Sequence, residues 1–159
     1  MAHPTVENIL EKVDIWNTDD IQYEELSGGL TNNNYTVRNN GEKYVLRIPG
    51  VGSELMIDRD LELSSSRMAA SVGVSPEVVC SVKPENAMVL TFIEGDVMHP
   101  ETVAGNDAYI EKIAGALRRL HENATFDKET YVFDMIPKYK RMCDDVGAFL
   151  PADFDWMLS

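Results

Sequence analysis

The sequence predicts an α+β fold in which a five-stranded antiparallel sheet with one inserted helix is followed by an all-helical segment. Three observations lead to this prediction. β-rich runs dominate residues 21–93, a single run with helical spacing interrupts them, and only helical patterns follow residue 100. The boundary falls near residues 94–97, so residues 1–94 form a mixed region and residues 95–159 a helical one.

A short opening helix and three strands begin the mixed region. Pro4 suits the first turn of a helix over residues 4–13, where apolar residues repeat at helical spacing. Asn39-Asn40-Gly41 joins the second and third strands, and Asn-Gly favours a tight hairpin because both residues tolerate positive φ. The strands are predicted over residues 21–26, 34–38 and 43–48.

The inserted helix is predicted from Ile57 to Val72, where apolar and small residues recur at helical spacing and Gly73 ends the run. Strands over residues 78–82 and 88–93 follow, separated by a Pro- and Asn-containing turn. Beyond Gly95 the pattern becomes helical. The helical region comprises one long apolar stripe over residues 109–121, capped by Asn106, and a weaker helix over residues 137–149.

The composition excludes several classes of function. The net charge of −13 repels phosphate backbones, so we expect no nucleic-acid partner. It favours a cationic small molecule only weakly, and solubility is the alternative reason for the acidic balance. No apolar run approaches the ~20 residues needed to span a bilayer. The first residues show no secretory signal, and Cys80 and Cys143 lie far apart without metal-ligand spacing. We therefore expect a cytoplasmic protein with free thiols and no bound metal.

A glycine-rich turn lies between the first two strands, in Ser27-Gly28-Gly29-Leu30-Thr31-Asn32. Two glycines allow the backbone to approach a ligand closely, and Thr and Asn supply hydrogen-bond donors, as in turns that hold phosphate groups. The turn matches neither the P-loop nor the dinucleotide-binding fingerprint. A hairpin turn without a ligand is the alternative interpretation.

Arg47 is the most informative charged residue of the strands. Alternation places Val45 and Arg47 on one face of the third strand and Leu46 and Ile48 on the other. An arginine in such an apolar strand needs a partner or an anion, and Glu62 on the inserted helix is a candidate partner. The alternatives are a surface acid for Arg47 and a solvated helix face for Glu62.

Five motifs occur in a characteristic order along the chain. These are Ser-Gly-Gly-Leu-Thr-Asn-Asn-Asn-Tyr at 27–35, Tyr-Val-Leu-Arg-Ile-Pro-Gly at 44–50, Ile-Asp-Arg-Asp-Leu-Glu at 57–62, Gly-Val-Ser-Pro-Glu-Val at 73–78 and Thr-Phe-Ile-Glu-Gly at 91–95. With them the chain resembles the choline/ethanolamine kinase family, part of the aminoglycoside-phosphotransferase-like kinases, over residues 22–140. A Leu-His helix end at 120–121 is also similar to that family.

The resemblance implies a protein-kinase-like small lobe over residues 1–94, followed by a hinge and the first helices of a truncated large lobe over residues 95–159. It also implies that ATP and Mg²⁺ are the cofactors of the complete enzyme and that a small, cationic alcohol such as choline is its substrate. By resemblance, Arg47 holds the nucleotide phosphates and Glu62 orients Arg47. The other implied nucleotide contacts are Gly28, Gly29, Leu30, Thr31 and Asn32 over the phosphates, Val45 and Leu90 beside the adenine, and the backbone of Thr91 and Ile93 at its edge.

The sequence lacks the residues that carry the family's chemistry. None of His3, His99 and His121 begins a His-x-Asp-x-x-x-x-Asn catalytic loop, so no catalytic or metal-binding residue is predicted. Asp155 lies in a Phe-Asp-Trp segment similar to the family's metal-binding Asp-Trp, but no catalytic loop precedes it, and we interpret it as helix packing. We therefore expect no phosphotransferase turnover from this chain alone.

Two other functions remain open on the sequence. The chain could belong to an aminoglycoside kinase or another small-alcohol kinase, since an acidic surface suits both kinds of cationic substrate. It could instead be a non-catalytic interaction or regulatory module. A bare small lobe leaves apolar surface exposed where a large lobe packs, so we expect self-association.

Overall fold

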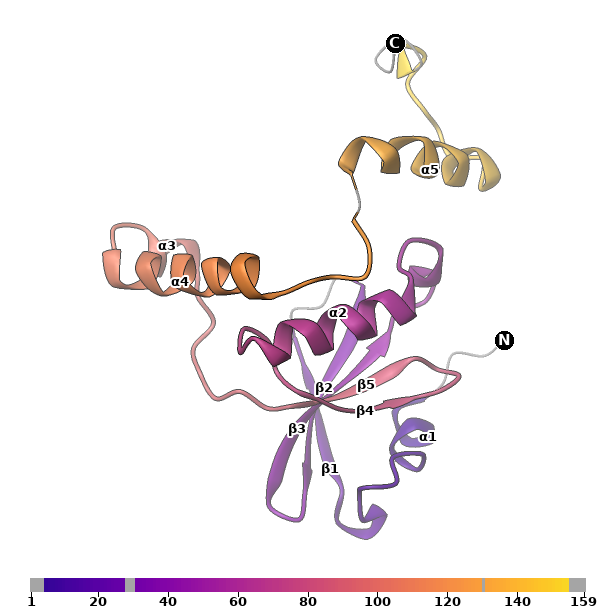
Figure 1. The fold of residues 1–159 in the computed structure, drawn as a ribbon. Coiled ribbons are helices and arrows are strands. Elements are labelled where there is room, and N and C mark those ends of the chain that lie inside the picture. Colours follow the sequence, from indigo (N-terminus) through magenta and orange to yellow (C-terminus); the bar gives the residue numbers. More distant parts are fainter. Residues whose placement is uncertain (1–4, 28–30, 130, 155–159) are drawn as a thin grey trace. The chain divides into compact units, whose positions relative to one another are not determined.

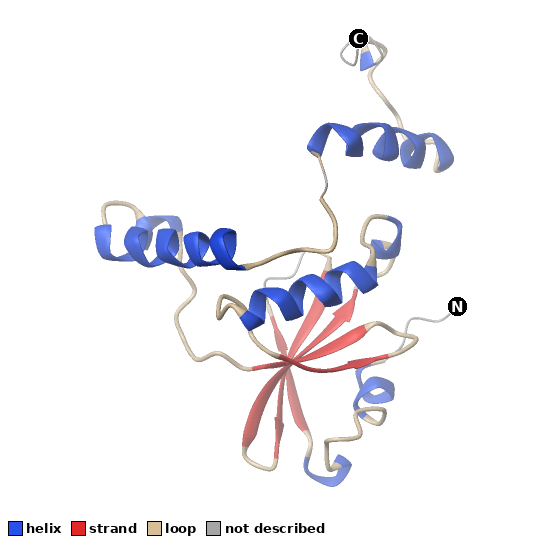
Figure 2. Ribbon diagram, in the orientation of Figure 1, coloured by secondary structure: helices blue, strands red, loops and turns tan. Residues whose placement is uncertain are grey.

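The computed structural model describes residues 5–27, 31–129 and 131–154 and confirms the predicted α+β fold (Figures 1 and 2). The chain divides into two compact units, Met1–Asp127 and Lys128–Ser159. The first unit contains the sheet, and the described residues of the second include helix α5 (Val132–Asp145). Strands are followed by helices near residue 95, where the sequence analysis drew its boundary. The two compact units divide later in the chain, after Asp127.

Five antiparallel strands form one sheet with the order β1-β2-β3-β5-β4. The hairpin between β2 and β3 turns at Asn40 and Gly41, whose φ angles of 51° and 80° are those the Asn-Gly signal predicts. The strand bounds are β1 Gln22–Leu26, β2 Asn32–Asn39, β3 Glu42–Pro49, β4 Val78–Val82 and β5 Ala87–Thr91. The sheet therefore places β3, which carries Arg47, at its centre.

The N-terminal segment covers one face of this sheet. Helix α1 (Val6–Leu10) is shorter than the predicted helix, because the chain turns after Leu10 so that Val13 and Trp16 also reach the core. The buried residues of this core are Ile9, Leu10, Val13, Trp16, Val37, Leu46, Ile48, Val82, Ala87 and Val89. The side chain of Asn39 joins the segment to the end of β2 by bonding both the N–H and the carbonyl of Asn17.

Helix α2 (Arg59–Ser71) follows the short helix η2 (Ser53–Leu55) and contacts β4. The side chain of Asp58 caps α2 by accepting a hydrogen bond from the Leu61 N–H at 3.1 Å. Gly73, with a φ of 71°, lies just beyond its end, as predicted. Figure 2 shows α2 running across the sheet.

The remaining helices are α3 (Pro100–Val103), α4 (Asp107–Asn123) and α5 (Val132–Asp145). Asn106 caps α4 as predicted, accepting from the Tyr109 N–H at 3.3 Å. Helix α5 begins five residues before the predicted start, because Pro137 lies inside it and not in its first turn. None of the helices in the described ranges is long and apolar enough to cross a membrane.

Candidate functional site

The face of the sheet opposite the N-terminal segment carries Arg47. The strand register pairs Arg47 with Asn34 on β2 and with Met88 on β5, and pairs Val45 with Thr36 and Leu90. Residues that face each other across antiparallel strands lie on the same side of a sheet. The structure thus brings together three of the predicted contacts, Val45, Arg47 and Leu90, on one surface.

Arg47 is half-buried on this surface and is held at one point. Its Nε donates a hydrogen bond to the Asn34 Oδ1 at 3.3 Å. Within the described ranges, its two Nη groups donate no hydrogen bond. The guanidinium therefore has donors left for an anion, and its charge is permanent.

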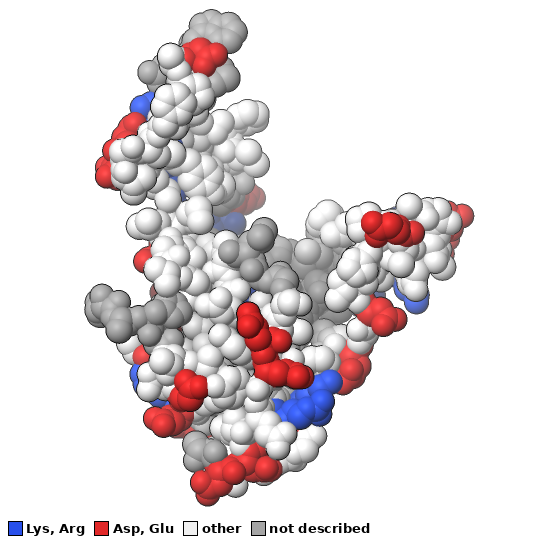
Figure 3. Space-filling view, turned by 180° about the vertical axis from the view of Figure 1, so that it is seen from behind, with Lys and Arg blue, Asp and Glu red and all other residues white. Residues whose placement is uncertain are grey.

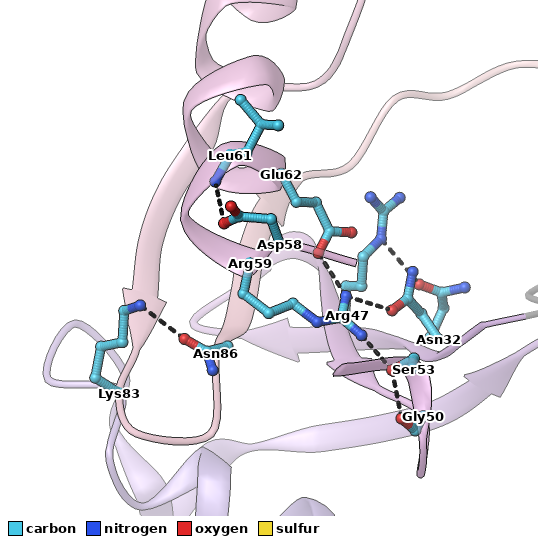
Figure 4. Close-up of polar contacts among 11 residues, drawn as sticks. Asn32, Arg47, Gly50, Ser53, Asp58, Arg59, Leu61, Glu62, Lys83 and Asn86 are labelled. Carbon is cyan, nitrogen blue, oxygen red and sulfur yellow. Dashed lines mark hydrogen bonds and ion pairs between the residues drawn. The ribbon is translucent and has the colours of Figure 1, made fainter. Parts of the chain in front are cut away.

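Glu62 has a different partner from the one the sequence suggested. Its Oε2 lies 2.5 Å from the Nη1 of Arg59, three residues earlier on the same helix, and the expected pair with Arg47 is not formed (Figure 4). The reason is local, because residues three apart on a helix are neighbours, whereas Arg47 lies on a separate strand. Sequence reasoning missed Arg59, although an arginine three positions before Glu62 was a visible signal.

Arg59 contacts two further segments. Its Nη1 donates to the Asn32 Oδ1 at 3.3 Å, and its Nη2 donates to the hydroxyl of Ser53. The Ser53 hydroxyl in turn donates to the carbonyl of Gly50 (Figure 4). These contacts connect α2, η2 and the first residue of β2.

The end of the glycine-rich turn is held against the end of β3. The Gly50 N–H donates to the carbonyl of Thr31 at 2.9 Å, and a Cβ placed on Gly50 would lie only 2.8 Å from that oxygen. Thr31 and Asn32 are therefore fixed from two sides. The other three predicted phosphate contacts, Gly28, Gly29 and Leu30, lie outside the described residues.

The segment after β5 is tied back to the start of β3. Lys43 lies 4.0 Å from the centroid of the Phe92 ring and forms an ion pair of 2.9 Å with Glu94. Thr91 donates its N–H to the Glu77 carbonyl and accepts the Glu77 N–H at its hydroxyl, both at 3.0 Å. Leu90 is buried, whereas Ile93 is 61% exposed. Ile93 therefore lies at the surface, whereas Leu90 does not.

Other candidate groups have structural roles. The His99 N–H donates to the Thr102 hydroxyl at the start of α3, and His121 lies in the last turn of α4. Burial raises the pKa of the Cys80 thiol, which makes this cysteine a poor nucleophile. Across residues 5–27, 31–129 and 131–154, no group of three His, Cys, Asp or Glu residues could hold a metal ion.

A five-stranded antiparallel sheet, a helix between its third and fourth strands and a connection leading into helices define the smaller lobe of a protein-kinase-like fold. Solved structures confirm this class. A gentamicin complex of the aminoglycoside phosphotransferase APH(2″)-IIa shares the fold with a TM-score of 0.61 at 18% identity, covering 99% of this chain and 55% of that one. The family model for choline/ethanolamine kinase matches residues 23–154, and the chain belongs to this family.

Individual relatives agree with the family assignment. Human ethanolamine kinase 1 (Homo sapiens) is 32% identical over 109 residues, which cover 67% of this chain and 24% of the relative. A crystal structure of a choline/ethanolamine kinase family protein from Mesorhizobium loti is 34% identical with a TM-score of 0.63, covering 84% of this chain and 42% of that one. The chain thus spans less than half of each of these two relatives.

Proposed function

We propose that the chain is the ATP-binding part of a small-molecule kinase, which in its complete form transfers the γ-phosphate of ATP to a small cationic alcohol. The observation that carries this proposal is the placement of Arg47. It lies on the same sheet face as Val45 and Leu90, its Nε is bonded to Asn34, and its Nη groups donate no hydrogen bond to any of the described residues. Membership of a kinase family supports a nucleotide as the ligand of this arrangement.

In this proposal Arg47 binds the phosphates of the nucleotide. A guanidinium offers two parallel donors that match two phosphate oxygens, and its half-buried position strengthens the attraction. Thr31 and Asn32, held by Gly50 and Arg59, supply the fixed end of the turn that covers the phosphates. Asn34 orients Arg47 in this proposal, a role that the family resemblance implied for Glu62.

The adenine is proposed to lie between Val45 and Leu90 and to meet the backbone of residues 91–93. Because the Thr91 N–H already donates to the Glu77 carbonyl, we expect Thr91 to meet the adenine through its carbonyl only. Ile93 is an exposed residue, and we expect its backbone to supply the second hydrogen bond. Lys43 holds this connection in place through Phe92 and Glu94. One structure that shares the fold, LicA at 24% identity, is a complex with AMP.

The proposed acceptor is an amino alcohol of the ethanolamine or choline type. Relatives are named ethanolamine kinase, and a structure with the same fold is the choline kinase LicA from Streptococcus pneumoniae. In the transfer, the acceptor oxygen attacks the γ-phosphorus, the bond to the β–γ bridging oxygen breaks, and ADP leaves. The net charge of −13 is compatible with a cationic acceptor.

Mg²⁺ would neutralise phosphate charge in such a reaction. The described residues provide no cluster of ligands for it, and the sequence has no catalytic-loop Asp and Asn, so we derive no step through the metal. In this proposal, the base that takes the hydroxyl proton also comes from outside this chain.

Calorimetric titration of Mg-ATP into the chain tests the binding site. We expect Arg47→Ala to weaken binding by about 1.5–3 kcal/mol, the usual value of hydrogen bonds to charged groups. Arg38→Ala, an exposed arginine on neighbouring β2, is the matched control and should leave binding unchanged. Equal affinities of the Arg47→Ala and Arg38→Ala variants would contradict the proposed phosphate site.

A coupled assay for ADP release tests the catalytic prediction separately. We expect no turnover with choline or ethanolamine from the purified chain. Its sequence has no catalytic-loop motif to supply the general base and the metal ligands. ATP-dependent phosphorylation of either alcohol by the pure chain would overturn this prediction. Nucleotide binding without turnover is the combined result that the proposed function requires.

A further inference from the structure

Arg59 is a largely buried charged residue near the proposed site, with only 9% of its side chain exposed. Its partners come from three segments: Asn32 begins β2, Ser53 begins η2, and Glu62 lies on α2 (Figure 4). The Nε of Arg59 is buried without a hydrogen-bond partner in the described part of the chain. We call Arg59, Asn32, Ser53 and Glu62 the Arg59 cluster.

The Arg59 cluster is more than a stabilising helix pair. Exposed ion pairs at this spacing contribute little, and burying an arginine carries a desolvation cost that a single carboxylate does not reliably offset. The unpartnered Nε adds to that cost. An ion pair within one helix can form at the surface and does not require burial. We therefore attribute the buried position of Arg59 to its contacts with Asn32 and Ser53.

Those contacts reach the segment that covers the phosphates in the proposed function. Asn32 is bonded directly to Arg59, and the preceding residue, Thr31, is bonded to Gly50. The Ser53 hydroxyl joins Gly50 to Arg59 and so closes the connection. The end of the glycine-rich turn is thereby fixed to α2 at two neighbouring residues, both through Arg59.

We infer that Arg59 is a positioning residue for the phosphate end of the nucleotide site, an inference that rests on the function proposed above. It fixes the start of β2 to the first turn of α2 without touching the nucleotide. Arg59 also holds the Glu62 carboxylate, which leaves Arg47 to the phosphates. Loss of Arg59 releases Asn32 and leaves the Glu62 carboxylate without its ion-pair partner.

Two measurements on the chain test this inference, with Arg59→Gln as the variant. Hydrogen–deuterium exchange without nucleotide should rise at residues 31–34 and 50–53, and Mg-ATP affinity should fall roughly three- to tenfold. Arg67→Gln, an exposed arginine on the same helix, is the matched control and should change neither. If Arg59→Gln does not fold, Arg59→Lys retains a positive charge beside Glu62 and should show a smaller effect in the same direction.

The outcomes separate this inference from the proposed function. Unchanged exchange at residues 31–34 in both Arg59 variants overturns the inference. It is also overturned if exchange rises but Mg-ATP affinity stays the same while Arg47→Ala weakens it. If the unaltered chain binds no Mg-ATP, the proposed function fails, and the exchange result still decides whether Arg59 fixes the start of β2.

Discussion

Gly50 lies at a close approach between two backbone segments of the site. Its N–H bonds the Thr31 carbonyl, and a Cβ at this position would lie 2.8 Å from the same oxygen. Because the obstacle is backbone, it cannot move aside as a side chain could. Any larger residue must therefore push the end of the glycine-rich turn away from β3.

We predict that Gly50→Ala lowers the free energy of unfolding by about 1–3 kcal/mol, as overpacking typically does. Gly95→Ala is the matched control, because a Cβ there meets nothing within 4 Å. Urea denaturation of both variants provides the comparison. The prediction is contradicted if both substitutions change the stability by the same amount.

For single residues, the face of the sheet on which a side chain lies was predictable from strand alternation. Leu46 and Ile48 are buried while Val45 and Arg47 are half-buried, as alternation along the strand predicted. The partner of Glu62 was predicted wrongly, because strand alternation says nothing about which arginine a helix residue meets. The i,i+3 spacing to Arg59 was a local signal for the pair that the structure shows.

Helix α1 and strand β1 are joined by a hydrogen bond from the Tyr23 hydroxyl to the Glu7 carboxylate. This bond is the main cause of a lowered pKa at Glu7 and of a raised pKa at Tyr23. The Glu7 contribution to stability is therefore complete above its unfolded pKa and is lost as the pH falls through the lowered folded pKa. The Tyr23 contribution is present below its unfolded pKa and is lost as the pH rises through the raised value.

We predict that Tyr23→Phe makes the stability less dependent on pH in both windows, below the ordinary glutamate pKa of 4.5 and above the ordinary tyrosine pKa of 10.0. Urea denaturation across these pH ranges measures the effect. Tyr139→Phe removes a hydroxyl from α5, in the other compact unit, and should leave the pH profile of the sheet unit unchanged. Parallel profiles for the original chain and Tyr23→Phe would contradict the prediction.

Among the elements, those with strong local signals were predicted well. The Asn-Gly hairpin, the Asn106 cap of α4 and the glycine stop after α2 all depend on a few adjacent residues. The packing of the N-terminal segment against the sheet was less predictable. It depends on Trp16 and on the bond between Asn39 and Asn17, contacts that link distant positions and leave no periodic pattern.

For the molecule as a whole, net charge and exposed apolar area have opposite effects on self-association. Acidic side chains are spread over the surface seen in Figure 3, in keeping with the net charge of −13. Helix α4 nevertheless exposes Ile110, Ile113 and Leu117, each 37–50% accessible. Repulsion between copies opposes association at low ionic strength, and added salt screens that repulsion.

We therefore predict that the chain self-associates at high protein concentration, and more strongly as the salt concentration rises. Light scattering over a concentration series at low and high salt measures this association. Leu117→Glu places a charge among the exposed apolar residues of α4 and should weaken it. Ala108→Glu adds the same charge at an exposed position outside this apolar group and is the matched control. A strictly monomeric chain at high concentration and high salt would contradict the prediction, whereas equal effects of the two variants would assign the association to charge and not to α4.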